Sequence, residues 1–327
     1  MKRVNVEDAV GKPLAHDIVR YGPKLKALLF KRGHVVRAED VEKLKDTGNY
    51  SVFVVEGEEG EVHEDDAALR MARAAMGENL SYKGPDKGSI NLIAEKPGLL
   101  KVKVDVLKQV NLIDDFIFVA RVNNTGVKKG AVVGAAKIVP LTVDESRMRK
   151  VEEILEKNKP VLEVVPPKIK KVGVIVTGTE VYEGRIEDAF VPVLKEKLGD
   201  YGLDVHESTI LPDDEEKIKK KILEFKETGH ELILVAGGMA VDSGDLTPAA
   251  IKSTGAEVVS RGAPTFPGAM IMLAYLGEVP VLGLPACVLP DKRTSLDRIL
   301  PRVLAKEKIT REEIAELGHG GFAWLGL

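Results

Sequence analysis

The 327-residue sequence has a single cysteine, Cys287, and few aromatic residues (5%). One cysteine excludes an internal disulfide framework and fits a reducing compartment, so we expect a cytoplasmic protein. The N-terminus lacks the apolar core of a signal peptide, and no apolar run reaches transmembrane length, so we expect no membrane partner. The net charge of −3 gives no electrostatic reason to expect nucleic acid. The six histidines show no ligand spacing, so we expect no zinc site.

A change of pattern divides the chain. Two prolines, Pro166 and Pro167, and the basic run 168–171 follow a helix-like segment at 144–158. Hydrophobic residues make up 44% of the chain, which is enough for more than one core. The expected segments are a small α+β domain (1–80), a β-rich domain (81–143), a helix and linker (144–169), an α/β domain (170–305) and a C-terminal tail (306–327).

The N-terminal half mixes short elements of both kinds. Helix-forming composition predicts helices over residues 38–47 and 65–76, and a strand follows at 51–55. Residues 88–140 look like β structure, with alternation over 99–106 and β-branched and aromatic residues over 116–122. We therefore expect this half to be α+β and rich in strands.

From residue 170 onward, buried strands alternate with amphipathic helices. Strands are predicted at 172–176, 204–210, 232–235 and 279–284, and Asp213 is predicted to cap the helix that ends at Gly229. The last helix is marked by apolar residues at helical spacing between 296 and 304. This alternation is typical of a parallel sheet with right-handed crossovers, in which ligands bind beyond the carboxyl ends of the strands.

The most informative loop follows the strand at 232–235. Gly237 and Gly238 end the strand, Asp242 and Asp245 lie in the loop, and a helix begins near Thr247. Glycines let backbone N–H groups approach a phosphate closely, and a helix N-terminus favours negative charge. Two carboxylates would repel a bare phosphate, but they fit a divalent cation between the loop and the phosphate. The alternative is that the glycines only form a turn and that Asp245 only caps the helix.

Three further segments carry glycine, hydroxyl or carboxylate groups near the same edge. The first strand is followed by TGTEVYEGRIEDAF (177–190), and the last strand by GLPACVLPDK (283–292). RGAPTFPGAM (261–270) adds a turn rich in proline and glycine. With the glycine-pair loop, these segments favour phosphate and metal chemistry at the sheet edge.

These segments, with LPDDEEKI at 211–218 and GGMAVDSGDLTPAAI at 237–251, occur in an order that resembles the molybdopterin-binding domain. That domain is shared by molybdopterin adenylyltransferases and by gephyrin-like molybdopterin molybdenumtransferases, and the resemblance covers residues 170–305. It implies a three-layer Rossmann-like fold that binds molybdopterin, or adenylated molybdopterin, together with a nucleotide and Mg²⁺.

Carried over to this chain, the resemblance implies catalytic roles for Asp245, Asp242 and Asp188, and Mg²⁺ binding by Asp245 and Asp242. It also implies a set of cofactor-binding residues. These are Thr177, Gly178, Thr179, Glu180, Gly237, Gly238, Ser243, Thr247, Pro267, Gly268, Gly283 and Pro285.

The chain departs from the family pattern in three places. Met239 and Ala240 follow the glycine pair where the family has a hydroxyl residue, and Gly244 replaces the arginine of the adenylyltransferases. After Gly-Leu-Pro, the family's Gly-Asn-Pro is replaced by residues 286–288, Ala-Cys-Val. Fewer side-chain donors remain for a phosphate or a pterin.

Two functions follow from the resemblance. The first is a transferase of molybdenum cofactor biosynthesis that acts on adenylate or molybdenum, with ATP or AMP and molybdate as partners. The second is a non-catalytic carrier or insertion chaperone that delivers the cofactor to a client molybdenum enzyme. The retained Asp-x-Thr-Pro at 245–248 favours the enzyme, and the lost donors favour the carrier. An unrelated nucleotide-binding regulator is a third reading, and a homo-oligomer is compatible with all three.

Overall fold

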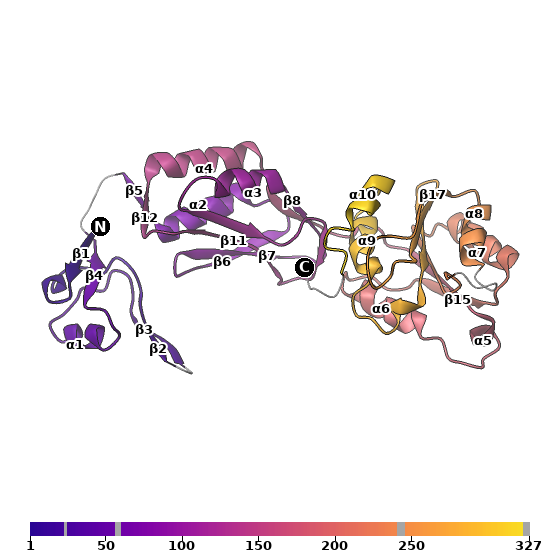
Figure 1. The fold of residues 1–327 in the computed structure, drawn as a ribbon, viewed down its shortest axis with the longest axis horizontal. Helices are drawn as coiled ribbons and strands as arrows, with labels where there is room; N and C mark the ends of the chain where they lie inside the picture. Colours follow the sequence, from indigo (N-terminus) through magenta and orange to yellow (C-terminus); the bar gives the residue numbers. More distant parts are fainter. Residues whose placement is uncertain (23–24, 56–59, 241–245, 323–327) are drawn as a thin grey trace.

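The computed structural model describes residues 1–22, 25–55, 60–240 and 246–322. Three units follow one another along the long axis in chain order (Figure 1). We call them the N-terminal unit (1–55), the middle unit (60–165) and the C-terminal unit (169–322). Among the helices that the structure describes, none is long and apolar enough to cross a membrane.

The N-terminal unit is small, and its strands form two separate pairs. β1 pairs with β4 and β2 pairs with β3, both antiparallel. The predicted helix at 38–47 forms as α1 with shorter bounds, and the strand predicted at 51–55 is β4. The elements are β1 (Lys2–Asn5), η1 (Glu7–Ala9), β2 (Ile18–Gly22), β3 (Leu25–Phe30), α1 (Asp40–Lys45) and β4 (Ser51–Val54).

The middle unit packs helices against an antiparallel sheet of order β6-β7-β11-β9. Buried residues from α2, the sheet and α4 join one core, so the expected boundaries at residues 80 and 143 run through that core. The elements are β5 (Glu61–His63), α2 (Glu64–Ala75), β6 (Leu80–Asp86), β7 (Ser89–Ala94), β8 (Gly98–Val102), α3 (Val104–Asn111), β9 (Phe116–Ala120), β10 (Thr125–Val127), β11 (Val132–Ile138), β12 (Thr142–Asp144), α4 (Glu145–Lys157) and β13 (Leu162–Val165).

One element of the middle unit contradicts the predicted β pattern. The alternation over 99–106 predicts a strand, but the strand ends at Val102 and α3 begins at Val104. Val106 and Val110 are buried on the inner side of α3, and four-residue spacing places both on one helix face. At the end of α3, Oδ1 of Asn111 accepts from the N–H of Phe118 in β9 (2.7 Å), and Nδ2 donates to the carbonyl of the same residue (2.9 Å). The side chain thereby covers part of the sheet edge.

The C-terminal unit is a three-layer α/β/α domain with a mostly parallel sheet, as predicted. The sheet has the order β15-β14-β16-β19-β18-β17. One core lies between the sheet and α6, α9 and α10, and a second lies between the sheet and α7 and α8. The elements are β14 (Val172–Thr177), α5 (Thr179–Tyr182), α6 (Phe190–Gly199), β15 (Glu207–Leu211), α7 (Glu215–Glu227), β16 (Leu232–Ala236), α8 (Thr247–Ser253), β17 (Glu257–Arg261), β18 (Met272–Leu276), β19 (Val279–Leu284), η2 (Ala286–Val288), α9 (Ser295–Leu304) and α10 (Arg311–Glu316).

Three predictions for this unit need correction. The sheet is not wholly parallel, because β18 pairs antiparallel with both β17 and β19; the two-residue turn Gly277-Glu278 joins β18 directly to β19. The cap of α7 is Asp214, whose side chain accepts from the N–H of Lys217, and not Asp213. The expected tail from residue 306 instead contains α10 and contributes buried Ile309 and Ile314 to the core.

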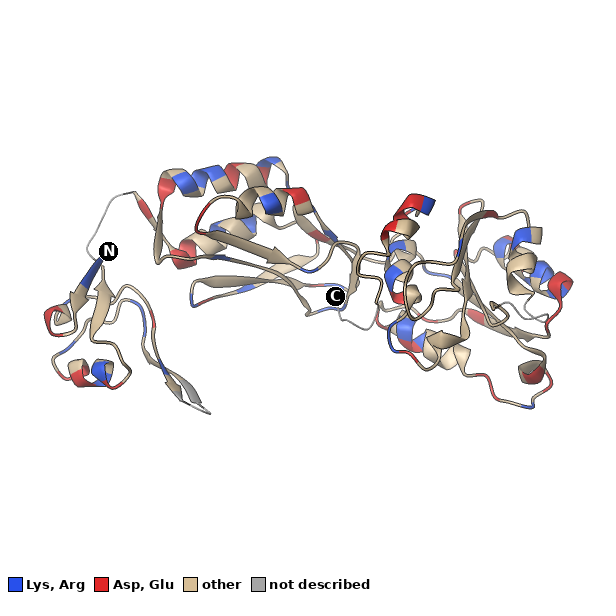
Figure 2. Ribbon diagram, in the orientation of Figure 1, with Lys and Arg blue, Asp and Glu red and all other residues tan. Residues whose placement is uncertain are grey.

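Charged residues of both signs lie side by side on α4 and α7, whereas the strands beneath them are mostly uncharged (Figure 2). This is the ordinary distribution for helices that bury one face and hydrate the other. It agrees with the small net charge of the chain, −3.

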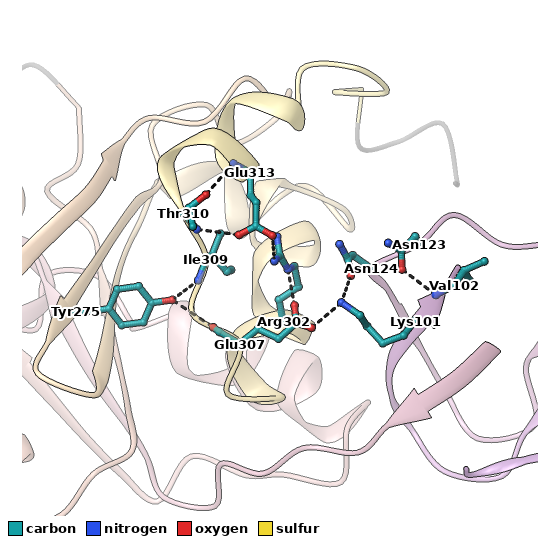
Figure 3. Close-up of polar contacts among 10 residues, drawn as sticks. All are labelled: Lys101, Val102, Asn123, Asn124, Tyr275, Arg302, Glu307, Ile309, Thr310 and Glu313. Atoms are coloured by element: carbon teal, nitrogen blue, oxygen red, sulfur yellow. Dashed lines mark hydrogen bonds and ion pairs between the residues drawn. The ribbon is translucent and has the colours of Figure 1, made fainter. Parts of the chain in front are cut away.

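A polar network joins the middle and C-terminal units (Figure 3). Lys101 of β8 donates to Asn124 of its own unit (2.7 Å) and to Glu307 of the C-terminal unit (2.6 Å). Glu307 also accepts from Arg302 in α9 (2.8 Å), and Arg302 pairs with Glu313 in α10. Arg302 is only 7% exposed, so these two carboxylates compensate a guanidinium charge that is buried away from water.

Candidate functional site

The carboxyl ends of three neighbouring parallel strands, β14, β16 and β19, form the candidate site. The strand order places β16 between the other two. Thr177 ends β14, Ala236 ends β16 and Leu284 ends β19. The N–H of Gly237 donates to the carbonyl of Leu284 (3.2 Å), which ties the glycine pair to the last strand. The topology thus brings together three segments that are far apart in sequence.

The glycine pair adopts a backbone that other residues rarely adopt. Gly237 has φ 101° and Gly238 has φ 59°. A Cβ at Gly237 would lie 2.4 Å from the carbonyl oxygen of Thr177, and one at Gly238 would lie 2.8 Å from Oγ1 of Thr247. Both glycines are therefore required by the close approach of β14 and α8, whether or not a ligand binds.

The amide of Gly238 has a distinct property. In the part of the chain that the structure describes, its N–H donates to no protein acceptor. An unpaired backbone donor in a tight turn at the end of a buried strand is suited to an anion. The geometry of this turn therefore fits a phosphate oxygen.

Two predicted hydroxyl residues hold the turn together. Thr247 is fully buried, and its hydroxyl donates to the carbonyl of Gly237 (2.8 Å). Its N–H donates to the carbonyl of Gly238 (3.2 Å). Oγ1 of Thr177 lies 3.3 Å from Oγ1 of Thr247 and 3.4 Å from the carbonyl oxygen of Ala236. These hydroxyls shape the turn, because protein groups already satisfy them.

The turn after β14 is held by Asp213, the residue predicted to cap α7. Asp213 follows β15, and its carboxylate accepts from both the N–H and the hydroxyl of Thr179 (2.9 and 3.1 Å). Gly178 has φ 151°, and Glu180 is exposed to solvent. The signal that could have placed Asp213 at the site is its position directly beyond the carboxyl end of a parallel strand.

Asp188 has a structural partner for each oxygen. Oδ1 accepts from the N–H of Phe190 (2.8 Å), and Oδ2 accepts from the N–H of Val191 (3.2 Å). The carboxylate therefore accepts from the first N–H groups of α6 from the position before its N-cap, Ala189. The other predicted acids, Asp242 and Asp245, and the neighbouring Ser243 lie outside the described residues.

The Pro-Gly turn is joined to the start of α9. Ser295 donates its N–H to the carbonyl of Pro267 (3.0 Å) and its hydroxyl to the carbonyl of Gly268 (2.7 Å). Gly268 has φ 109°, and a Cβ there would lie 2.3 Å from Oγ of Ser295. These contacts fix the turn against α9, where no larger residue would fit.

The residue after the glycine pair points into the protein. Met239 is 3% exposed, and its Sδ would lie 2.6 Å from a Cβ built at Gly283 in β19. Pro285 follows β19 and precedes η2. Cys287 lies in η2, where burial and the charge of Asp291 raise the pKa of its thiol. Gly283 therefore makes room for Met239, and the side chain at position 239 fills the core instead of facing a ligand.

The geometry of a metal site is not visible in the described ranges. Among residues 1–22, 25–55, 60–240 and 246–322, no three His, Cys, Asp or Glu side chains converge as they would around a metal ion. The acids predicted to bind Mg²⁺ are Asp242 and Asp245, so the described residues do not test that prediction.

Comparison with known proteins confirms the resemblance in the C-terminal unit. Residues 173–305 match a family model described as "Probable molybdopterin binding domain". The matched residues lie within the C-terminal unit and make up less than half of the chain. Residues 3–56 match a model described only as a domain of unknown function.

Curated relatives match over a shorter stretch. A CinA-like protein of Mycobacterium avium (strain 104) is 32% identical over 95 residues, which are 29% of this chain and 20% of the relative. One of Mycobacterium tuberculosis (strain ATCC 25177 / H37Ra) is 31% identical over 91 residues, 28% of this chain and 19% of the relative. The chain thus spans about a fifth of the length of these relatives.

Several solved structures are similar to about two fifths of the chain. CinA of unknown function from Thermoplasma acidophilum is 17% identical and covers 41% of this chain and 98% of its own, with a TM-score of 0.37. The molybdopterin biosynthesis enzyme MoaB from Thermus thermophilus is 20% identical and covers 42% and 98%, with a TM-score of 0.35. The tungsten cofactor synthesizing protein MoaB from Pyrococcus furiosus is 20% identical and covers 43% and 90%, with a TM-score of 0.32.

Proposed function

We propose that the C-terminal unit binds molybdopterin or adenylated molybdopterin at the carboxyl ends of β14, β16 and β19, and acts on it as a transferase of adenylate or molybdenum. The observation that carries this proposal is the N–H of Gly238, which donates to no acceptor among the described residues, in a turn held by Thr177 and Thr247. This turn lies in the stretch that matches the molybdopterin-binding family model. A phosphate oxygen of the pterin would accept from this amide.

The side chains divide into those that shape the site and those that would act in it. Thr177, Thr247 and Gly237 fix the turn through buried hydrogen bonds, and Asp213 fixes the neighbouring turn through Thr179. Asp245 and Asp242 would hold Mg²⁺, which neutralises charge on phosphate oxygens during transfer of a phosphoryl or adenylyl group. ATP or AMP and molybdate would be the co-substrates of such a transferase.

A second function is favoured by one observation. Met239 occupies the position where the family has a hydroxyl residue, and its side chain is buried against Gly283. A site that holds the pterin through backbone groups but offers fewer side-chain donors suits a carrier. Such a protein would pass the cofactor to a client molybdenum enzyme.

Co-purification tests the binding proposal. The protein is expressed in a host that makes molybdopterin and in a matched strain that does not, and bound pterin is identified by fluorescence after oxidation. We expect near-stoichiometric pterin from the first host only. Absence of pterin from both, together with no binding of added molybdopterin, contradicts the proposal.

Turnover then separates the two functions. AMP formation and release are followed for the loaded protein, with and without molybdate. Release of AMP that depends on molybdate identifies the molybdenumtransferase. Release of pyrophosphate from ATP, with transfer of AMP to molybdopterin, identifies the adenylyltransferase. Tight binding with neither reaction identifies the carrier.

A further inference from the structure

A cavity of about 460 Å³ lies between the middle and C-terminal units. The middle unit contributes residues 121–128, which include β10. The C-terminal unit contributes α6, the start of α9 and the loop at 288–294. Figure 1 shows α6 and α9 on the side of the C-terminal unit that faces the middle unit. The volume falls within the usual range for small-molecule sites.

This cavity does not include the glycine turn of the candidate molybdopterin site. Its lining contains none of the residues that form the turn or its supports, such as Thr177, Gly238 or Thr247. Lys292 and Arg293 also line an adjoining hollow with Pro267 of the Pro-Gly turn. A ligand in the cavity would therefore lie beside the candidate site and away from the glycine turn.

Contacts across the boundary hold the walls in place. Gly126 of β10 faces Tyr201 and Pro301, and a Cβ at Gly126 would lie 2.1 Å from the Tyr201 hydroxyl and 2.8 Å from Cγ of Pro301. Lys128 pairs with Asp200 across the same boundary at 2.6 Å. Only glycine at residue 126 leaves room for Tyr201, so the two units pack closely at this wall of the cavity.

The lining carries more positive than negative charge. Lys128 is neutralised by Asp200, and Lys197 is neutralised by Asp297 (2.8 Å). The remaining charged residues of the lining are the cations Arg121, Lys292, Arg293 and Arg298 and the carboxylates Glu196 and Asp291.

Two of those cations are already placed by protein groups. The Nε of Arg121 donates to the carbonyl of Val132 (2.6 Å), and Nη1 of Arg298 donates to the carbonyl of Gly320 (3.0 Å). For Lys292 and Arg293, no side-chain hydrogen bond or ion pair occurs with any residue that the structure describes. Because no described residue pairs with them, these two side chains can meet an anion, and a guanidinium can bind a phosphate through two parallel hydrogen bonds.

Tyr201 adds an aromatic surface to the charged wall. Tyr201 is one of the lining residues, and its hydroxyl makes no hydrogen bond to any residue in the described ranges. Burial, reinforced by Asp297 and Asp200, raises the pKa of this phenol, so it stays a neutral donor at ordinary pH. A flat ring could stack on the tyrosine while its phosphate meets the cations.

We propose that this junction cavity binds a small phosphate-bearing aromatic molecule of the nucleoside monophosphate class, with the phosphate on Arg293 and Lys292 and the base against Tyr201. Such a ligand would touch both units at once. Binding would therefore stabilise the arrangement of the middle unit against the C-terminal unit.

Calorimetric titration with AMP tests the proposal, and inorganic phosphate and adenosine serve as partial probes. We expect AMP to bind at least ten-fold more tightly than either part alone. Arg293→Ala should weaken AMP binding about ten-fold, as expected for a lost charge-assisted hydrogen bond. Arg293→Lys should weaken it less, and the exposed Arg185→Ala should leave it unchanged.

The glycine turn supplies the test that separates the two sites. Gly238→Asp should leave AMP binding at the junction intact while it removes molybdopterin binding. A photoreactive azido-AMP should label peptides that contain residues 193–201 or 288–298. Labelling of 177–188 instead, loss of AMP binding in Gly238→Asp but not in Arg293→Ala, or equal affinity for AMP and phosphate would each overturn the proposal.

Discussion

The carboxylate of Glu307 accepts a 2.6 Å hydrogen bond from the ammonium of Lys101, across the boundary between the middle and C-terminal units. The two residues are 206 positions apart in sequence (Figure 3). Glu307 is also one of two carboxylates that neutralise the buried guanidinium of Arg302. One side chain thus serves the core of its own domain and the contact between domains.

Glu307→Gln should therefore destabilise the protein. The change removes the charge that Lys101 and Arg302 share, and it leaves Arg302 with Glu313 alone. We expect a loss of roughly 2 kcal/mol in the free energy of unfolding of the C-terminal unit. Denaturant titration measures it, with the exposed Glu312→Gln on α10 as control. Equal effects of the two variants would show that the network contributes nothing specific.

The same residue predicts a dependence on pH. Burial alone would raise the pKa of Glu307, but the hydrogen bonds and charges of Lys101 and Arg302 outweigh burial and leave this pKa below its ordinary value. A carboxylate with a depressed folded-state pKa stabilises the fold above its unfolded pKa, and the stabilisation is lost as pH falls through the folded value. Stability measured from pH 7 to pH 3 should fall less steeply in Glu307→Gln than in the wild type. Identical slopes would contradict the assignment.

Gly238→Asp should abolish molybdopterin binding while the protein remains folded. The carboxylate would occupy and repel the place of the phosphate. The side chain also enters a left-handed backbone with Thr247 Oγ1 only 2.8 Å from the new Cβ, so we expect about 1–2 kcal/mol of destabilisation. Gly202→Asp is the matched control, because Gly202 has φ 72° with no atom within 4 Å of a Cβ. Unchanged pterin affinity in Gly238→Asp would place the phosphate elsewhere.

Asp245→Asn separates a metal ligand from a helix cap. Asparagine caps a helix about as well as aspartate, so a capping role predicts little change. A Mg²⁺ ligand would lose its charge, and adenylate chemistry should fall by about 10²-fold while pterin affinity stays near the wild type. Asp144→Asn is the control, because Asp144 lies in the middle unit and caps α4 with one oxygen, which accepts from the N–H of Ser146 (2.8 Å). Turnover of Asp245→Asn at the wild-type rate, with unchanged Mg²⁺ dependence, would exclude the catalytic role.

Trypsin should cut the link between the middle and C-terminal units only after local opening, and this cut should release a stable C-terminal fragment. The lysines of the link are held in place: the N–H groups of Lys170 and Lys171 donate to Glu231 (2.8 and 3.2 Å), and the N–H of Lys168 donates to Leu304 (2.8 Å). Cleavage therefore requires local opening, and Glu231→Gln should accelerate it. Cuts scattered through 172–300 would contradict an independent domain.

Local pattern was sufficient for much of the C-terminal unit. Continuous apolar runs predicted β14 and β16, because a strand buried on both faces needs no polar positions. Helical spacing predicted α4 and α9 close to their observed bounds, because one face of each packs on a core. The motifs between residues 177 and 285 also sufficed for the family resemblance, because their order along the chain can be read without the structure. A glycine pair after a buried strand likewise predicts a sharp turn from local sequence.

Tertiary structure decided what depends on partners distant in sequence. The direction of β18 follows from its hairpin with β19. Helix α2 shares a core with strands that come after it in the chain. Local pattern shows that these elements are apolar, but it does not show which surface they pack against. The packing of Met239 against Gly283 and the hydrogen bond from Thr179 to Asp213 also join residues more than thirty positions apart, so local sequence did not predict them. The sequence determined which segments turn and which are buried. Only packing determined which groups face one another, because burial energy depends on neighbours that the chain brings together when it folds.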